Sequence, residues 1–354
     1  MDDRASVRVA RGIASVRERL DRYFDELRIR ATRFGDAEAI VEALRDASDG
    51  GKYVRPKLVL LVHSTLGGDE HSAAIDVAAA FELLHTALVV HDDIIDRDWY
   101  RRGKPNIGGR YRARAEVSGA SDDDAAHHGA SAAVIAGDLA LAGSLQLVAM
   151  LTTDETRRLR LLRIMDDAVI ASAIGELADI EHPHRLLLTA DDVARTHRAK
   201  TAVYTFEAPL QAGAVLAGAS ERVVTLLGEF GRHLGTAYQI LDDIAGVFGD
   251  ERETGKQAGG DIRSAKQTTV TVIAQTAPTW PEVEHLFGKS DISLAELTHF
   301  RDVLDKGGTF RAAEDQATSQ LHAARQALDK LPAELRHRLT PMLATVAGHG
   351  RQIV

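Results

Sequence analysis

The stretch FELLHTALVVHDDIIDRDWYRRGKPN, residues 81–106, places the strongest constraint on how this chain folds. An apolar helical run ends there in three aspartates and is followed by two arginines: Asp92, Asp93, Asp96, Arg101 and Arg102. At about 3.6 residues per turn, Asp92 and Asp96 share one helix face, with Asp93 close to Asp96. Carboxylates on one face repel one another unless a cation lies between them, and magnesium suits such oxygen ligands. The stretch predicts a metal and anion site at a helix end; the alternative is a solvated acidic helix terminus.

A second apolar helix also ends in paired acids, within the segment AYQILDDIAGVFGDERETGKQAGGDIRSAKQTT, residues 237–269. This segment holds two aspartates, a glutamine one turn earlier and two later lysines: Asp242, Asp243, Gln239, Lys256 and Lys266. Two acid pairs at the ends of two apolar helices, each followed by cations, favour one functional site over two unrelated solvated faces.

The long segments have helical rather than alternating periodicity, and 45% of the 354 residues are hydrophobic, which is enough for a substantial core. We therefore expect an all-α protein without strands. The expected helices are 4–30, 36–47, 57–66, 71–98, 129–150, 155–180, 189–217, 221–249, 292–306, 309–330 and 333–348. Residues 107–128 lack an apolar face and read as a mobile insertion, and no linker divides the chain, so residues 1–354 form one predicted domain.

Charge and composition exclude several classes of protein. A net charge of -9 argues against a generic nucleic-acid binder, and the absence of cysteine excludes disulfides, thiolate nucleophiles and cysteine zinc sites. The start MDDRASVR lacks the basic and apolar regions of a signal peptide. No apolar run is expected to reach the roughly 20 residues that span a bilayer. We expect a cytoplasmic protein without a membrane span.

Weaker candidate residues lie elsewhere in the chain. In GGKYVRPK, Lys52 and Arg55 project near a helix start, which favours anions, although such charges are often simply solvated. His85 lies seven residues before Asp92 on almost the same face, as a ligand or as a core histidine. Lys200, followed by Thr201, interrupts an apolar stripe in HRAKTAVYTFEAP, where a lysine ordinarily reaches out to solvent.

Taken in order, these motifs resemble the trans-isoprenyl diphosphate synthases, the polyprenyl synthetase family. The resemblance covers nearly the whole chain. It consists of GGKYVRP, DDIID with RRGKP, Gly137–Asp138, Lys200–Thr201, YQILDD, Gly255–Lys256 and Lys266. The segment DDIIDRDWYRRGKPN and the glycine after the second aspartate pair look most like actinobacterial geranylgeranyl diphosphate synthases.

The resemblance implies an isoprenoid synthase type I helical bundle around a deep central cavity, usually a homodimer. Its two aspartate motifs face each other across the cavity mouth, where three magnesium ions hold an allylic diphosphate. The implied metal ligands are Asp92, Asp96 and Asp242. The implied catalytic set is Asp92, Asp93, Asp96, Asp242, Asp243 and Lys200. Isopentenyl diphosphate would bind Lys52, Arg55, His85 and Arg102, and the allylic diphosphate Arg101, Lys200, Thr201, Gln239, Lys256 and Lys266.

The implied reaction breaks the allylic carbon–oxygen bond, leaving pyrophosphate and a carbocation that the double bond of isopentenyl diphosphate attacks. Metal ions with Arg101, Lys200 and Lys256 stabilise the charge on the leaving group. Pyrophosphate accepts the final proton, so no protein nucleophile is needed. One departure from the family's DDxxD is Gly246, which stands where the second motif often has a third acid. It puts metal affinity, rather than the reaction, in question.

Product length in this family depends on cavity depth, which bulky aromatics before the first aspartate limit. Here those positions are Leu88 and Ala87, with Leu84 and Phe81 further down the helix; Phe81 lies about 16 Å below Asp92. We expect mainly a C20 product, geranylgeranyl diphosphate, with longer chains second. The alternatives are a non-catalytic subunit of a heteromeric synthase and a class I terpene cyclase, against which the intact GGKYVRP and RRG motifs count.

Overall fold

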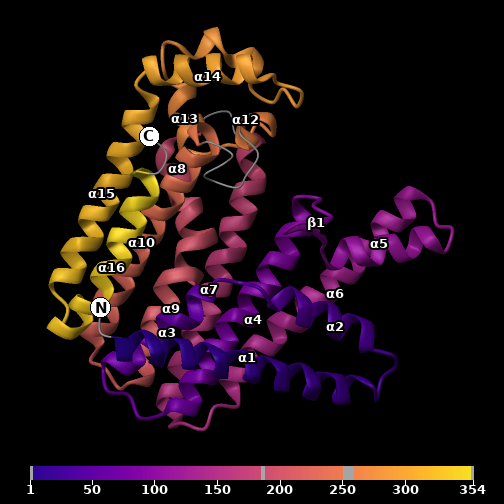
Figure 1. Ribbon diagram of the computed structural model, residues 1–354, viewed down its shortest axis with the longest axis vertical. Helices are drawn as coiled ribbons and strands as arrows, with labels where there is room; N and C mark the ends of the chain where they lie inside the picture. Colours follow the sequence, from indigo (N-terminus) through magenta and orange to yellow (C-terminus); the bar gives the residue numbers. More distant parts are fainter. Residues whose placement is uncertain (1–2, 185–187, 250–258, 352–354) are drawn as a thin grey trace. The chain divides into compact units, whose positions relative to one another are not determined.

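The computed structural model describes residues 3–184, 188–249 and 259–351, which are almost entirely helical (Figure 1), and the all-α prediction is confirmed. Lys256 lies outside the described residues. The chain divides into two compact units, one of residues 1–165 with 212–219 and one of residues 166–211 with 220–354. The boundary passes through two helices, α7 and α9. The prediction of a single domain over residues 1–354 stays a prediction.

The first unit is organised around helix α4, which packs against α1, α3 and α6 (Figure 1). Its elements are α1 Asp3–Ala31, α2 Glu38–Ser48, α3 Val54–Thr65, α4 His71–Ile95, β1 Tyr100–Arg101, β2 Lys104–Pro105, α5 Ile107–Val117, α6 Asp122–Ala149, the start of α7 Glu155–Glu181 and the end of α9 Ala208–Leu216. Buried residues run through α4 from Ala73 to Val90 on every side. An apolar helix of this kind belongs in a core.

A short hairpin follows α4 and was not predicted. Asp96 is the C-cap of the helix, and Arg97 takes a left-handed conformation with φ 58°. In the hairpin Tyr100 pairs with Pro105 and Arg101 with Lys104. Arg102 and Gly103 form the tip with φ of 52° and 74°, as a two-residue type I′ turn requires. Strands of two residues are too short to leave an alternating pattern, yet they position both arginines of the motif.

The predicted mobile insertion, residues 107–128, is largely helical, and its mobility stays a prediction. Residues 107–117 form α5 and α6 begins at Asp122, and the two helices pack together. Local capping explains this: the Asn106 side chain accepts a hydrogen bond from the Gly109 amide at 2.8 Å. Ser121 caps α6, whose first turn carries three aspartates that favour its positive end. Apolar periodicity does not predict α5 and the first turns of α6, because capping residues and charges stabilise them.

Two described helices, α4 and α6, are long and apolar enough to cross a membrane by length and composition alone. The most apolar window is 72% buried inside the protein in α4 and 50% buried in α6. The expectation that no apolar run is long enough to span a bilayer is therefore wrong, since both helices have the required length and composition. Because a buried core helix has the same composition, the absence of a membrane span stays a prediction.

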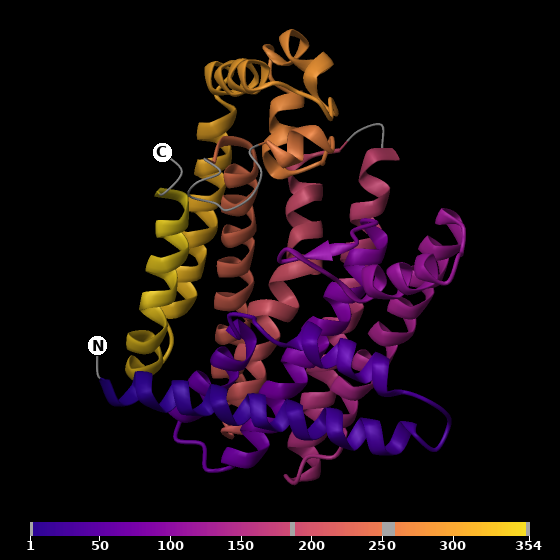
Figure 2. The same ribbon diagram turned by 45° about the vertical axis from the view of Figure 1, so that its right-hand side comes forward.

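The second unit is organised around α10 Glu221–Phe248, against which α15, α16 and η2 pack, as Figure 2 shows for α15 and α16. Its other elements are the end of α7, η1 His182–His184, α8 Ala190–His197, η2 Arg198–Glu207, the start of α9, α12 Gly260–Arg263, α13 Thr269–Gln275, η3 Trp280–Glu282, η4 Glu284–Leu286, α14 Leu294–Lys306, α15 Thr309–Asp329 and α16 Ala333–Arg351. Leu227, Phe230 and Leu234 of α10 are fully buried, so this helix forms the centre of the unit's core.

The predicted helix 189–217 is helical but changes its winding. Its middle, η2, is a π-helix that contains Lys200 and Thr201, between α8 and α9. π-Helical turns are rare and occur frequently at functional sites. The apolar pattern runs on through the segment, so the sequence gives no sign of the change.

Candidate active site

The three aspartates at the end of α4 have different surroundings. Asp92 is half-buried, Asp96 is exposed and Asp93 is buried at 5% exposure. Oδ1 of Asp93 accepts two hydrogen bonds from Arg101, at 2.8 Å from Nε and 2.5 Å from Nη2. Burial raises the pKa of Asp93 even though Arg101 acts to lower it. Asp93 thus accepts both hydrogen bonds from Arg101, whose Nη2 also lies 3.6 Å from Oδ2 of Asp92, and Asp92 and Asp96 are the more exposed carboxylates.

A cavity of about 350 Å³, here called the substrate cavity, is lined by Asp93 and Arg101. It is lined by residues that include Gly50, Gly51, Glu82, His85, Arg101 and Arg102. Of the four residues predicted to bind isopentenyl diphosphate, His85 and Arg102 line the cavity. Lys52 is exposed and Arg55 is buried, and neither belongs to its lining. Burial, and next the three arginines Arg55, Arg101 and Arg102, hold the pKa of His85 well below its ordinary value. Its imidazole is therefore a neutral hydrogen-bonding group.

Glu82 is a functional candidate that the sequence left ambiguous. It is 3% exposed and lines the substrate cavity three residues before His85. A methyl group on Gly51 would lie 3.1 Å from Oε1 of Glu82, so the glycine turn closes directly over this carboxyl group. Nη1 of Arg102 donates a hydrogen bond to the Asp49 carbonyl of the same turn at 2.9 Å. Burial raises the pKa of Glu82, while Arg55 and Arg102 oppose that shift. Glu82 is the buried anion of this cationic site.

Gly137 and Asp138 of α6 receive the side chain of His91. Nε2 of His91 lies 3.5 Å from Oδ1 of Asp138. A methyl group on Gly137 would lie 2.2 Å from the same nitrogen, closer than any real contact. The Gly–Asp pair thus makes room for the residue directly before Asp92 and pairs with it, so it fixes the end of α4 against α6.

Alanine at Gly137 is expected to lower the free energy of unfolding by about 1–3 kcal/mol, because the added methyl group overpacks the His91 contact. Thermal unfolding of the purified variant measures this. The matched control is Gly348→Ala in α16, where nothing lies within 4 Å of the added methyl and helix propensity favours alanine. Equal stability of the two variants would contradict the tight His91 contact.

The predicted chain-length residues lie along α4. Phe81, Leu84 and Ala87 are buried at 0%, 0% and 1% exposure, whereas Leu88 is half-buried one turn before Asp92. The structure therefore separates the two positions predicted to limit product length. Ala87 is almost fully buried, whereas part of the surface of Leu88 is exposed.

In the second unit, Lys200 is held by acids of α7. Its Nζ lies 3.0 Å from Oε1 of Glu176 and 2.9 Å from Oδ2 of Asp179. Burial acts to raise the pKa of Asp179, but Lys200 brings it below its ordinary value. Lys200, which interrupts the apolar stripe, is therefore half-buried, and its ammonium group is held in a fixed orientation. Thr201 follows it in the π-helix.

The second aspartate pair divides its roles in the same way as the first. Asp243 is buried at 4% exposure, and its Oδ2 accepts a hydrogen bond from the Thr269 amide at 3.0 Å. Gln239 donates to its Oδ1 at 3.4 Å, and Nδ1 of His197 lies 3.5 Å from its Oδ2. Asp242 is half-buried. Asp243 ties α10 to the start of α13, which leaves Asp242 as the candidate ligand of this pair.

Asp261 is a candidate residue that the sequence did not reveal. A methyl group on Gly246 would lie 2.2 Å from Oδ2 of Asp261, so this carboxylate occupies the space of a side chain at position 246. The Lys266 amide donates to the Asp261 carbonyl at 2.9 Å. Desolvation acts to lower the pKa of Lys266, but Asp261 and Asp179 raise it above its ordinary value. The acid absent from position 246 is present in the same place on α12.

Among the residues that the structure describes, no three acidic or histidine side chains are grouped closely enough to hold a metal by themselves. The exposed donors are nevertheless all carboxylate oxygens. Magnesium is typically bound by one or two carboxylates together with substrate phosphates and water. The donor set at the end of α4 fits that mode of binding.

Residues 37–299 match the model of the polyprenyl synthetase family. The chain is 32% identical over 300 residues to the geranylgeranyl diphosphate synthase of Sulfolobus acidocaldarius, covering 81% of this chain and 84% of the relative. It is 34% identical over 275 residues to the (2E,6E)-farnesyl diphosphate synthase of Mycobacterium bovis, covering 75% and 70%.

Among solved structures, it resembles geranylgeranyl pyrophosphate synthase from Corynebacterium glutamicum complexed with isoprenyl diphosphate and magnesium. The TM-score is 0.83 at 26% identity, over 95% of this chain and 97% of that one. Similarity to archaeal and mycobacterial relatives is thus nearly equal, and a particular closeness to actinobacterial enzymes stays a prediction.

Proposed function

Because the chain belongs to the polyprenyl synthetase family, and is therefore a chain-elongating prenyltransferase, we propose that its main product is geranylgeranyl diphosphate. The observation that carries this proposal is that no phenylalanine, tyrosine or tryptophan stands on α4 between the buried Phe81 and Asp92. The two relatives named above have products of different length at similar identity, so identity alone does not choose the product.

We further propose magnesium as the metal, with Asp92, Asp96 and Asp242 as its ligands. The observation that supports the choice is chemical: these donors are carboxylate oxygens, and the solved relative carries magnesium. When bound, the metal neutralises the charge that develops on the departing pyrophosphate. Asp93 and Asp243 are buried and serve to hold Arg101 and α13.

The chain's own residues then bind and orient the substrates. Arg102 and the neutral His85 of the substrate cavity bind isopentenyl diphosphate, while Arg101 binds the allylic diphosphate. Lys200 is oriented by Glu176 and Asp179 and adds positive charge for the leaving group. The buried apolar residues of α4 exclude water, which would quench the carbocation.

The test is the chromatographic chain length of the products that the purified protein makes from isopentenyl diphosphate with C5, C10 and C15 primers. A C20 product supports the proposal. Longer products would show that the chain extends beyond Phe81. No condensation with any primer would contradict the assignment as an enzyme. Asp92→Asn should abolish turnover. The matched control Asp123→Asn, at an exposed acid in the first turn of α6, should not.

Phenylalanine at Leu88 is expected to shift the product from C20 towards C15, because a ring one turn before Asp92 would block the growing chain and the position is only half-buried. Product chromatography measures the shift. Ala87→Phe is a poorer test, because Ala87 is 1% exposed and a ring there overpacks the core by about 1–3 kcal/mol. Leu159→Phe, at a residue 57% exposed, is the control. Unchanged products from Leu88→Phe would remove this position from the chain-length pocket.

We also propose a cytoplasmic homodimer. Ile170, Ile174 and Leu177 lie on one face of α7 and are 53%, 60% and 52% exposed, an apolar row that a monomer would leave in water. Ile174→Glu is expected to convert the dimer to a monomer, as measured by light scattering after gel filtration. Leu294→Glu, at a 75% exposed residue of α14, is the matched control. A wild-type protein that elutes as a monomer would contradict this proposal.

A further inference from the structure

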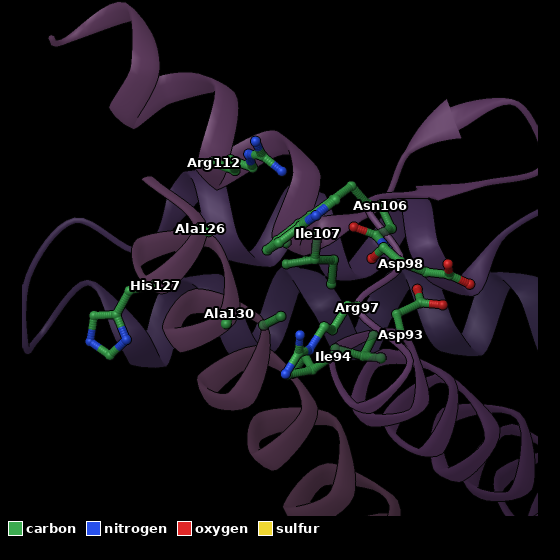
Figure 3. Close-up of a pocket in the computed structure, with 14 residues that line it drawn as sticks. Asp93, Ile94, Arg97, Asp98, Asn106, Ile107, Arg112, Ala126, His127 and Ala130 are labelled. Atoms are coloured by element: carbon green, nitrogen blue, oxygen red, sulfur yellow. The ribbon is translucent and has the colours of Figure 1, made fainter. Parts of the chain in front are cut away.

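We propose that a second cavity in the first unit is a binding site for a short apolar chain with an anionic head group, distinct from the substrate cavity. The cavity has a volume of about 380 Å³ and lies where the end of α4, the start of α5 and the first turns of α6 meet (Figure 3). A small-molecule site typically has a volume of about 300–1,000 Å³. This inference goes beyond prenyl transfer and does not depend on it.

The lining selects an apolar chain of limited length. Its walls include Val90, Ile94 and Trp99 on one side and Ala130 and Ala133 of α6 on the other. The small alanines leave the space that larger residues would fill. The volume is similar to that of the substrate cavity, and a short chain of about ten carbons is the occupant tested below.

The rim carries charges of both signs, and Arg97 is the group that would hold an anionic head. In Figure 3, Asp93, Asp98 and Asn106 gather at one side and His127 lies at the other, with Ile107 between them. Asp93 is paired with Arg101, and Asp98 is exposed to solvent. Within the described parts of the chain, the exposed side chain of Arg97 forms no hydrogen bond or ion pair.

Arg112 is already engaged. It pairs with Glu116 at 2.9 Å and with Asp122, and it lies over the Trp99 ring at 5.0 Å from the centroid. Arg97 is therefore the positive group at the rim that is available to a carboxylate or phosphate head.

The two cavities share a wall. Val90, Asp93, Asn106 and Ile107 line both this cavity and the substrate cavity. Asp93 is also the carboxylate that holds Arg101. An occupant that contacts Asp93 in one cavity therefore changes the position of Arg101 in the other. Each ligand then changes the affinity of the other ligand by the same factor.

The binding test uses Trp99 as its probe. The chain has two tryptophans, so the full-length Trp280→Phe protein reports on Trp99 alone. Citronellate, a C10 isoprenoid carboxylate, is the ligand; citronellol is its neutral counterpart and octanoate its straight-chain counterpart. The expected result is a saturable change in fluorescence with citronellate. Equal binding of octanoate assigns the site to fatty acids as well as isoprenoids, whereas no saturable change with either anion overturns the proposal.

Two variants place the ligand. Ala130→Leu fills the cavity and is expected to abolish binding, while Ala149→Leu, at an exposed position of the same helix, retains it. Arg97→Asn, whose asparagine tolerates the left-handed backbone, is expected to weaken citronellate at least tenfold and leave citronellol unchanged. Because Arg97→Asn leaves the cavity volume unchanged, it tests whether the ligand binds in this cavity even if Ala130→Leu folds poorly. Unchanged citronellate binding in either variant overturns the assignment to this cavity.

Coupling is tested without turnover. Pyrophosphate with magnesium is added to the Trp280→Phe protein, and the citronellate titration is repeated. A shifted affinity is expected, and it should disappear in Asp93→Asn, which loses the charged contact to Arg101. An unchanged affinity in the presence of bound pyrophosphate would overturn the coupling. Since no step requires prenyl transfer, failure here is distinct from failure of the proposed enzyme activity.

Discussion

Asparagine in place of Asp261 is expected to raise the magnesium concentration required for half-maximal turnover by about tenfold or more, the usual cost of losing a carboxylate that supports a metal site. The carboxylate of Asp261 fills the space beside Gly246, where the family motif often has its third acid. It also raises the pKa of Lys266 against the effect of desolvation, so the substitution removes a negative charge that favours the ammonium form of Lys266. A magnesium titration of the initial rate measures the effect.

Exchanging the residues at positions 246 and 261 tests whether the location of the carboxylate matters. Gly246→Asp alone should lower stability, because its side chain would collide with Asp261. Gly246→Asp combined with Asp261→Gly should recover the magnesium requirement, since the acid then stands at the position common in the family. Asp302→Asn, at an exposed residue of α14, is the control. A wild-type magnesium requirement in Asp261→Asn would show that the second motif works with Asp242 and Asp243 alone.

The parts of the fold and site that the sequence predicts are those that depend on nearby residues. Asp92 and Asp96 follow from helical spacing, and the structure places them at the end of α4 as expected. The all-α architecture follows from periodicity in the same way. The short hairpin and α5 were missed because left-handed residues and caps, not apolar patterns, make them.

The roles that the sequence does not separate depend on contacts between distant segments. Asp92 and Asp93 are the same residue type, but only Asp93 is buried and accepts hydrogen bonds from two nitrogens of Arg101. Asp261 lies fifteen positions after Gly246 and reaches it through the packing of α12 on α10. A carboxylate that binds a ligand and one that holds an arginine therefore look alike until their neighbours are known.

Glutamine in place of Glu82 is expected to lower the free energy of unfolding by about 3–5 kcal/mol, the cost of removing one partner from a buried group of charges. Glu82 and Arg55 are 3% and 9% exposed, so neither gains solvent when the other is neutralised. Chemical denaturation measures the loss. Glu18→Gln, at an exposed residue of α1, is the control and should change stability by less than about 0.5 kcal/mol.

The same substitution is expected to raise the KM for isopentenyl diphosphate about tenfold and to leave the KM for the allylic substrate nearly unchanged. Losing a negative charge strengthens anion binding by about 2 kcal/mol at roughly 8 Å and an effective dielectric constant of about 20. Misplacing the two arginines beside Glu82 costs about 1.5–3 kcal/mol for each charged contact. We expect the second effect to be larger, because the turn that accepts the hydrogen bond of Arg102 at Asp49 packs closely on Glu82 at Gly51. A lower KM for isopentenyl diphosphate would show that Glu82 only weakens the positive potential of the site.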